Sequence, residues 1–205
     1  MSIATYSQLK TAIADFLNRD DLTAVIPTFV ALAEADINRR VRHWRMEKRS
    51  TATIDSRYSA LPGDYLEAIR FHLDVDERTI EISSSYELQK SRMAHGDILG
   101  KPEFFAIVGG QIEVWPTPDV PYAGELYYIS RTDALSDENA ANWLLQYYPD
   151  AYLYGALTHS APYLSEDQRA QVWAALYQNA IDAINIESKM AKTNASGLRM
   201  RVNSY

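Results

Sequence analysis

Residues 142–192 read NWLLQYYPDAYLYGALTHSAPYLSEDQRAQVWAALYQNAIDAINIESKMAK, and this stretch predicts three consecutive helices. Pro149 ends the first helix and suits the first turn of the next, where its missing N–H costs nothing. The second helix, residues 150–160, is apolar nearly all round, so it belongs inside a bundle, where Gly155 lets a neighbouring helix approach closely. The third helix is expected to begin at Ser165, because Ser165 and Gln168 have the spacing of a capping box. Its apolar stripe consists of Val172, Trp173, Leu176, Tyr177, Ala180, Ile181 and Ile184.

Two more helices are predicted near the N-terminus, over residues 5–18 and 23–44. In each, apolar side chains recur at steps of three and four, which indicates one buried face. Together with the three C-terminal helices they predict a helical bundle domain formed by residues 1–47 and 134–192. The expected inner faces are Leu9, Ile13, Phe16 and Leu17 in the first helix and Ile26, Phe29, Val30, Ala33, Ile37 and Val41 in the second.

Between these helices, residues 48–133 change to a period of two, which is typical of strands. The clearest signal is the pair Gly109-Gly110 between two alternating runs, which predicts a tight hairpin. We therefore predict an α+β fold: a mainly α-helical bundle, with two N-terminal and three C-terminal helices, and an inserted small antiparallel β region with one short helix. The expected strands are 50–55, 66–73, 79–82, 104–108, 111–115 and 125–131, with a turn at 59–64 and the helix ending near Ala94.

Charge is unevenly distributed along this acidic chain of 205 residues, whose formal net charge is −7. Residues 39–49 contain six basic side chains against the single acid Glu47, and no acid follows Glu187. Such segregation predicts two basic patches on an acidic body, which serve protein assembly as well as they serve nucleic-acid binding. Within the first patch we select Arg39, Arg40, Arg42 and Arg45 as partner-contact candidates.

Residues 193–205 are predicted to form an extended C-terminal arm, because they show no helical periodicity and little apolar content. Two interpretations stay open: a frayed terminus, or an arm that becomes ordered against a partner. In the second interpretation apolar anchors alternate with charged contacts. The candidate partner-contact residues of the arm are Leu198, Arg199, Met200, Arg201, Val202 and Tyr205.

Catalytic signatures are absent from the sequence, so we expect no enzyme, no cofactor and no metal. The four histidines, His43, His72, His95 and His159, are scattered and match no HExxH motif, so structural or surface roles are expected. Neither a nucleophile elbow nor a phosphate-binding glycine loop occurs, and the acid pairs lie in turns, where carboxylates are usually solvated. The absence of cysteine excludes disulfides and thiolate sites and fits a reducing compartment.

Membrane contact and sequence-specific DNA binding are not expected either. The N-terminal residues lack a basic region followed by an apolar core, and no apolar run approaches the roughly 20 residues that a membrane span needs. We therefore expect a soluble protein that is made in the cytoplasm. A DNA-binding module remains a third interpretation of the basic segment, against which the acidic pI of about 5.1 argues.

Several stretches, in the same order along residues 23–192, resemble phage head-to-tail adaptor proteins, also called neck or tail accessory factors. They are FVALAEADINRRVR, LPGDYLEAIRFHL, GKPEFFAIVGGQIEVWPTPD and NWLLQYYPDAYLYGALTHSAPYLSEDQRAQVWAALYQNAID. The resemblance implies a ring, commonly of twelve copies, that lies beneath the portal protein, continues the DNA channel and presents a platform for tail or nozzle proteins. It also implies that the C-terminal arm contacts the portal or a neighbouring subunit.

The function expected from this resemblance is a structural head-to-tail adaptor in the neck of a virion. The expected partners are the portal protein, tail or nozzle proteins, other copies of the chain, and genomic DNA that passes through the channel without being read. The alternative is a peptidoglycan hydrolase of the phage tail, because some adaptors of short-tailed phages are credited with cell-wall hydrolysis. No residue motif of this chain carries that activity over.

Overall fold

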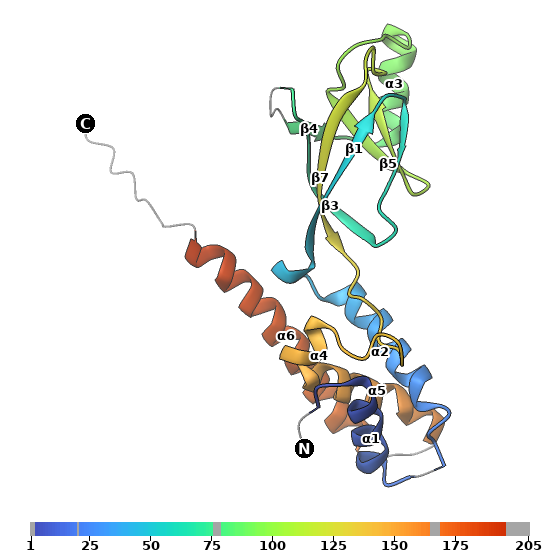
Figure 1. Ribbon diagram of the computed structural model, residues 1–205, viewed down its shortest axis with the longest axis vertical. Coiled ribbons are helices and arrows are strands. Elements are labelled where there is room, and N and C mark those ends of the chain that lie inside the picture. The colour runs from blue at the N-terminus through green and yellow to red at the C-terminus, as the bar shows by residue number, and fades with distance from the viewer. Residues whose placement is uncertain (1–2, 20, 76–78, 165–168, 196–205) are drawn as a thin grey trace, which may run out of the picture. The chain divides into compact units, whose positions relative to one another are not determined.

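The structure is a computed structural model that describes residues 3–19, 21–75, 79–164 and 169–195 (Figure 1). The chain divides into two compact units, residues 1–46 with 132–205 and residues 47–131. We call the first the helical unit and the second the β unit. In the described parts of the chain, no helix is both long enough and apolar enough to cross a membrane.

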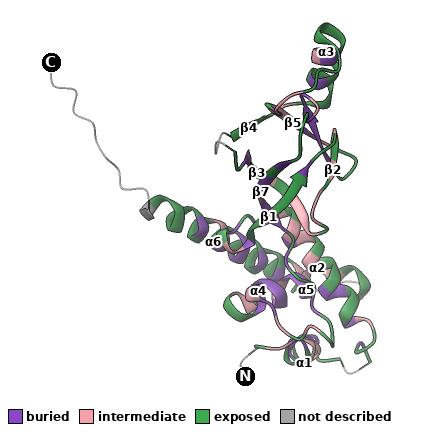
Figure 2. Ribbon diagram, turned by 45° about the horizontal axis from the view of Figure 1, so that its top comes forward, coloured by how far each residue is buried: buried purple, intermediate pink, exposed green. Residues whose placement is uncertain are grey.

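The helical unit is built around α5 (Pro149–Leu164), which is buried along most of its length (Figure 2). α1 (Tyr6–Leu17), α2 (Ile26–Arg40) and α6 (Ala170–Ala195) each pack against it, and α4 (Trp143–Tyr147) directly precedes it. These five helices confirm the five that the sequence predicts. The interior position of α5 follows from its apolar circumference, because a helix without a polar face is stable only where other helices cover it.

Local sequence determines several helix ends. The side chains and backbone N–H groups of Thr5 and Gln8 form a reciprocal capping box at the start of α1. The side chain of Asn142 accepts the N–H of Leu145 at 2.9 Å and caps α4. Pro149 is the first residue of α5, as predicted. The expected capping box at residues 165–168 lies outside the described residues.

Gly155 brings α5 into close contact with two neighbouring helices, which confirms its predicted role. A Cβ atom at this position would lie 3.1 Å from Cβ of Ala33 on α2 and 3.0 Å from Cε2 of Tyr177 on α6. Since carbon atoms pack best at about 3.5–4.0 Å, only glycine fits here without displacing a helix. The absence of a side chain at Gly155 therefore determines how closely α2 and α6 approach α5.

α6 buries a narrower face than its sequence predicts. Five members of the predicted stripe are buried, whereas Val172 and Leu176 remain 58% and 37% exposed. Val172 and Leu176 lie about 120° and 85° from the centre of the buried side, because successive residues are separated by about 100° around a helix. α6 packs mainly on α5, and one neighbouring helix covers only one side. The buried members are Trp173, Tyr177, Ala180, Ile181 and Ile184.

The β unit contains a seven-stranded sheet with the strand order β1-β7-β3-β4-β5-β6-β2. All neighbouring strands are antiparallel except β4 and β5, which run parallel. α3 (Ser85–His95) connects these two parallel strands and packs on β5 and β6. The strands are β1 (Glu47–Ile54), β2 (Tyr58–Ala60), β3 (Tyr65–Leu73), β4 (Thr79–Ile82), β5 (Phe104–Val108), β6 (Gln111–Trp115) and β7 (Tyr122–Ser130).

The predicted fold class is therefore wrong. The β unit is a seven-stranded mixed sheet, not a small antiparallel region inserted in a mainly α-helical bundle. It has a hydrophobic core of its own, formed by ten buried residues that include Phe71, Val114 and Leu126. The sequence does not reveal the full number of strands. β1 buries only Ile54, so it lacks the alternation of a half-buried strand, and β2 falls in the segment predicted as a turn. The parallel pairing of β4 with β5 across α3 is long-range and leaves no local signal.

Candidate functional site

Two of the four selected arginines in the helical unit are occupied by contacts inside that unit. The carboxylate of Asp36 accepts hydrogen bonds from Arg39 at 3.3 Å, Arg40 at 3.1 Å and the Tyr177 hydroxyl at 2.9 Å. Burial alone would raise the pKa of Asp36, but these hydrogen bonds outweigh it and lower the pKa. Arg40 also bonds Gln178 on α6. Arg40, Asp36 and Tyr177 thus join α2 to α6, whereas Arg39 pairs with Asp36 within α2 and its side chain stays 68% exposed.

Arg42 closes the end of α2. Its guanidinium donates to the carbonyl oxygens of Asn38 and Val41 at 3.0 and 2.8 Å, which are groups that the last turn of a helix leaves unpaired. Its backbone N–H donates to Oδ1 of Asn185 on α6 at 3.0 Å. The exposed side chain of Arg42 is thus held at the surface where α2 ends beside α6.

Arg45 lies between two exposed aromatic rings. Its guanidinium carbon is 4.4 Å from the ring centre of Trp44 and 4.2 Å from that of Tyr147 on α4, an arrangement that stabilises the cation over both π faces. Trp44 and Tyr147 are 40% and 57% exposed. We call these three residues the Arg45 sandwich. Sequence reasoning selected Arg45 but missed Tyr147, which lies 102 residues away along the chain.

A buried histidine fixes the backbone beneath the Arg45 sandwich. His43 is fully buried, stacks on Trp143 with ring centres 5.0 Å apart, and accepts the backbone N–H of Arg45 on Nδ1 at 3.2 Å. The hydroxyl of Tyr148 lies 3.5 Å from its Nε2. Burial and a hydrogen bond to Glu187 raise the pKa of Tyr148 to about 12. His43 is therefore structural, as predicted.

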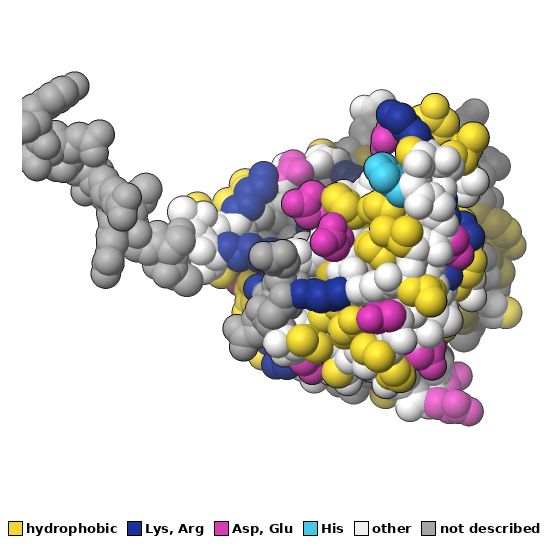
Figure 3. All heavy atoms as spheres, turned by 90° about the horizontal axis from the view of Figure 1, so that it is seen from above, with side chains coloured by type: hydrophobic (Ala, Val, Ile, Leu, Met, Phe, Trp, Pro, Cys, Tyr) yellow, Lys and Arg dark blue, Asp and Glu magenta, His cyan; other side chains and the backbone are white. Residues whose placement is uncertain are grey.

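A basic hollow of about 650 Å³ adjoins the sandwich. The backbone N–H of Trp44 donates to Oγ of Ser188, one of the residues that line the hollow, at 3.1 Å. Four basic side chains and one acid face the hollow, so its potential is positive. The lining residues are Arg40, Arg42, Asp182, Asn185, Ile186, Ser188, Lys189 and Lys192. Basic side chains near the outer end of α6 are visible in dark blue in Figure 3.

Four exposed apolar side chains lie along one side of α6, where no described helix covers them, and one of them, Ile186, lines the same hollow. Val172, Leu176, Ile186 and Met190 are 58%, 37%, 51% and 59% exposed. Their spacing of 4, 10 and 4 residues places them within about 80° of one another around the helix. We call these four residues the α6 apolar face. The Arg45 sandwich, the basic hollow and the α6 apolar face together form what we call the assembly surface.

The arm residues selected from the sequence, Leu198, Arg199, Met200, Arg201, Val202 and Tyr205, lie outside the described residues. The last described residues of α6, from Lys189 to Thr193, are all exposed. α6 thus leads away from its own packing partners before the arm begins. The ribbon of α6 extends beyond the other helices of the helical unit and is coloured mostly exposed near its end (Figures 1 and 2).

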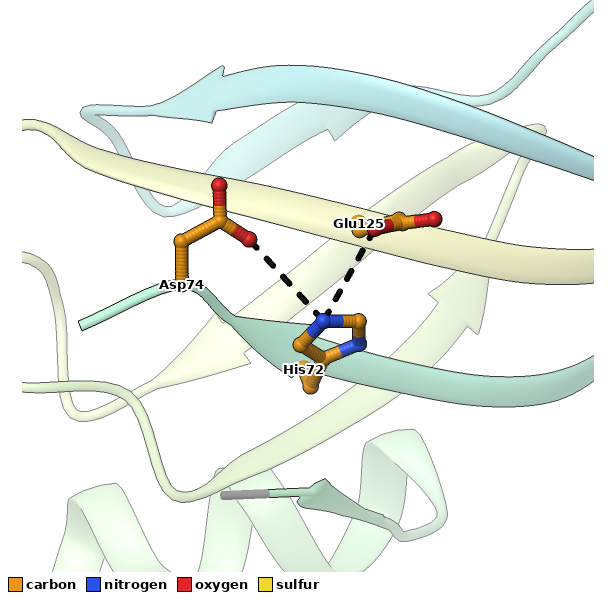
Figure 4. Close-up of side chains that lie close together, drawn as sticks. All are labelled: His72, Asp74 and Glu125. Atoms are coloured by element: carbon orange, nitrogen blue, oxygen red, sulfur yellow. Dashed lines mark ion pairs between the residues drawn. The ribbon is translucent and has the colours of Figure 1, made fainter. Parts of the chain in front are cut away.

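The β unit contains a polar cluster that sequence reasoning did not find. His72 on β3 is the cross-strand partner of Glu125 on β7, and Asp74 follows β3 (Figure 4). Nε2 of His72 lies 3.8 Å from Oε2 of Glu125 and 3.9 Å from Oδ1 of Asp74. His72 and Asp74 are two residues apart, which indicates only that their side chains lie on the same face of an extended segment. Glu125 joins them through strand pairing, which leaves no trace in the local sequence.

The protein-family models contain one that matches residues 4–201, and this family is described as SU10 adaptor protein. The chain belongs to the SU10 adaptor protein family. The match runs through both units and includes the whole assembly surface. Among the curated proteins, none matches this chain.

Membership in the SU10 adaptor protein family makes the chain a phage adaptor protein. It places the adaptor in the virion, where it contacts other head or tail proteins. At this level the predicted family, function and location are confirmed. Within the adaptor, Arg40 contacts α6, Arg39 and Arg42 are exposed, and Arg45 is half-buried between the exposed rings of Trp44 and Tyr147.

Proposed function

We propose that the adaptor joins the portal to the tail of a phage as a ring in the virion neck, with twelve copies as the expected number, and that the ring continues the DNA channel. Family membership supports the adaptor role, and the assembly surface supports contact with protein partners. The observation that carries the proposal is the Arg45 sandwich, because an arginine held between an exposed tryptophan and an exposed tyrosine has the composition of interface hot spots.

The charge of the assembly surface defines the kind of partner it fits. The chain as a whole carries −7, whereas the basic hollow carries four cations and one acid. An acidic surface of a neighbouring copy or of the portal would therefore be attracted to it. A contact in which one surface of a copy binds a different surface of the next copy is heterologous, and such contacts close into a ring when the rotation between copies permits.

The α6 apolar face supplies the second element of an interface. Four apolar side chains between 37% and 59% exposed extend along one helix, where a helix from another copy could cover them. Burial of apolar area contributes about 25 cal/mol per Å² and does not depend on direction. Apolar contacts of this kind would hold neighbouring copies together, while the charged hollow and the Arg45 sandwich would determine their orientation.

The proposal includes no catalytic activity and no sequence-specific recognition of the genomic DNA in the channel. A hydrolase would need a carboxylic acid with a raised pKa at an accessible site. Burial does raise the pKa of Glu34, but its carboxylate accepts the N–H of Leu135 at 2.8 Å and the hydroxyl of Tyr152 at 3.1 Å inside the helical unit. These contacts are those of a structural carboxylate.

For the C-terminal arm we propose an anchoring role. Residues 196–205 follow the exposed end of α6 and carry a positive charge without acids. We propose that the arm binds the portal or a neighbouring copy, with tail or nozzle proteins docking on the opposite side of the ring. Deleting residues 196–205 should abolish portal binding and leave the melting temperature unchanged, and a deletion variant that still binds the portal contradicts the anchoring role.

The main experiment is sedimentation velocity with negative-stain imaging of the adaptor, alone and mixed with the portal protein of the same phage. The test variant is Arg45→Glu, which reverses the charge inside the sandwich and leaves the backbone hydrogen bond to His43 in place. The control is Arg19→Glu, an exposed arginine that pairs with Asp21 near the end of α1. Both variants are first compared with the wild type in thermal melting.

Rings should form with the wild type and with Arg19→Glu, whereas Arg45→Glu should remain monomeric or assemble at least about tenfold more weakly. If Arg45→Glu assembles as the wild type does, the sandwich is not the contact that carries the proposal. If the wild type neither forms rings nor binds the portal, the ring function itself is refuted.

A further inference from the structure

His72, Asp74 and Glu125 converge on one point of the β unit from two neighbouring strands (Figure 4). One nitrogen and two carboxylate oxygens lie within 4.8 Å of one another. The separations from Nε2 of His72, 3.8 and 3.9 Å, are too long for direct hydrogen bonds. The three donor atoms therefore surround a space without contacting each other, which is the arrangement around a bound cation.

The surroundings orient these ligand atoms. Arg49 bonds Oε1 of Glu125, which leaves Oε2 directed toward His72. The side chains of Glu125 and His72 are 9% and 13% exposed, and the His72 ring stacks on Tyr127 with ring centres 6.0 Å apart. Nδ1 of His72 makes no hydrogen bond with any described residue, so no partner commits Nε2 to carrying the proton. A neutral imidazole can then offer Nε2 as a ligand.

We propose that His72, Asp74 and Glu125 bind a divalent transition-metal ion, with zinc as the ion that fits best. The point equidistant from the three ligand atoms lies at most about 2.5 Å from each, against zinc–nitrogen and zinc–oxygen bonds of about 2.0–2.2 Å. Side-chain movements below about 0.5 Å would complete the contacts, and Asp74 can make them because its side chain is 56% exposed.

Ligand chemistry and charge favour zinc over harder ions. Imidazole nitrogen suits zinc, whereas calcium and magnesium prefer a complete set of oxygen ligands. Two carboxylates and the guanidinium of Arg49 give the cluster a net charge of about −1 with neutral imidazole, so a dication is attracted. The exposed side of Asp74 leaves room for water as the remaining ligand. Such an ion would tie the end of β3 to the middle of β7. This inference is independent of the proposed ring function.

The test is calorimetric titration of the full chain with zinc chloride in a buffer that does not chelate zinc. Wild-type protein should bind one zinc ion per chain at this site, and His72→Gln and Asp74→Asn should each weaken binding by at least about tenfold. Asp74→Asn is the variant least able to disturb the fold, because its side chain is the most exposed of the three. The matched control is His95→Gln, which removes an exposed histidine of α3 and should bind zinc as the wild type does.

Thermal melting with and without zinc gives a second readout. Zinc should raise the melting temperature of the wild type and of His95→Gln, and should leave that of Asp74→Asn unchanged, because only a bound ion stabilises the folded state. The inference is overturned if the wild type gives no binding heat up to millimolar zinc. It is also overturned if both His72→Gln and Asp74→Asn bind zinc with wild-type affinity.

Discussion

Replacing Gly155 by alanine tests the close packing of α5 in the helical unit. The added Cβ would lie 3.0 Å from Cε2 of Tyr177 and 3.1 Å from Cβ of Ala33. Neither neighbour can move away easily. Cβ of Ala33 is fixed to the backbone of α2, and the Tyr177 hydroxyl donates to Asp36 at 2.9 Å. The substitution must therefore push α2 or α6 away from α5.

Two opposing free-energy terms determine how much Gly155→Ala changes the stability of the helical unit. Gly155→Ala improves helix propensity by about 1 kcal/mol, because alanine loses less conformational freedom than glycine on folding. Overpacking a well-packed core costs about 1–3 kcal/mol, and two contacts about 0.5 Å too short with pinned neighbours place the cost near the upper end. We therefore expect a net loss of about 1–2 kcal/mol in the free energy of unfolding of the helical unit, or roughly 3–6 °C in melting temperature.

The assay is urea denaturation followed by far-ultraviolet circular dichroism, in which the helical unit gives most of the helix signal. The matched control is Gly63→Ala, because a Cβ at Gly63 meets no atom within 4 Å and the change should stay within about 0.5 kcal/mol. Adding Ala33→Gly to Gly155→Ala removes one short contact, so part of the loss should return once the separate cost of Ala33→Gly is subtracted. A Gly155→Ala variant as stable as the wild type, or more stable, would refute the packing argument.

Two further predictions concern a helix cap and buried phenols. Asn142→Ala should cost about 2–3 kcal/mol, since Asn142 caps α4 and also donates to the hydroxyl of the buried Tyr152 at 2.7 Å. Asn142→Ser keeps a capping oxygen without adding a charge and should lose less, which denaturation curves of both variants would check. Burial and a hydrogen bond to Asp64 raise the pKa of Tyr128 to about 12, and the pKa of Tyr148 is also raised to about 12. An ultraviolet titration should therefore show tyrosine ionisation near pH 12, and Tyr128→Phe should remove one of these ionisation steps. The pKa of Tyr128 is 10.0 in the unfolded chain, so its contribution to the free energy of unfolding is complete below pH 10 and is lost as the pH rises toward 12. A free energy of unfolding that does not change across this pH range would contradict the raised pKa of Tyr128.

The helical unit shows how much local sequence can predict. Amphipathic spacing located its five helices, the proline at 149 marked the junction of α4 and α5, and Gly155 was identified as a point of close approach. These features depend on residues a few positions apart, which share a helix face or a turn whatever the rest of the chain does. The width of the buried face of α6 was not predictable, because it depends on how many helices pack against it.

The β unit shows where such reasoning fails. Strand stretches were recognised, yet their number and order were not, since β4 pairs in parallel with β5 across α3 and β2 pairs with β6 from a segment predicted as a turn. Strand pairing is made by backbone groups distant along the chain, and a largely exposed strand such as β1 carries no alternating pattern. The size of the sheet, and with it the fold class, was therefore decided only in three dimensions.

The candidate sites also combine features that local sequence predicts with features that depend on contacts between distant residues. The sequence by itself determined that the chain is acidic with a basic segment, that its helices are amphipathic, and that it resembles phage adaptors. Only the tertiary structure decided how each basic residue is held: Arg40 pairs with Asp36 and bonds Gln178 on α6, Arg39 pairs with Asp36 but stays 68% exposed, and Arg45 lies between Trp44 and Tyr147. Composition and periodicity are properties of the chain, but charge pairing and ligand convergence require groups from distant segments to meet within a few ångströms.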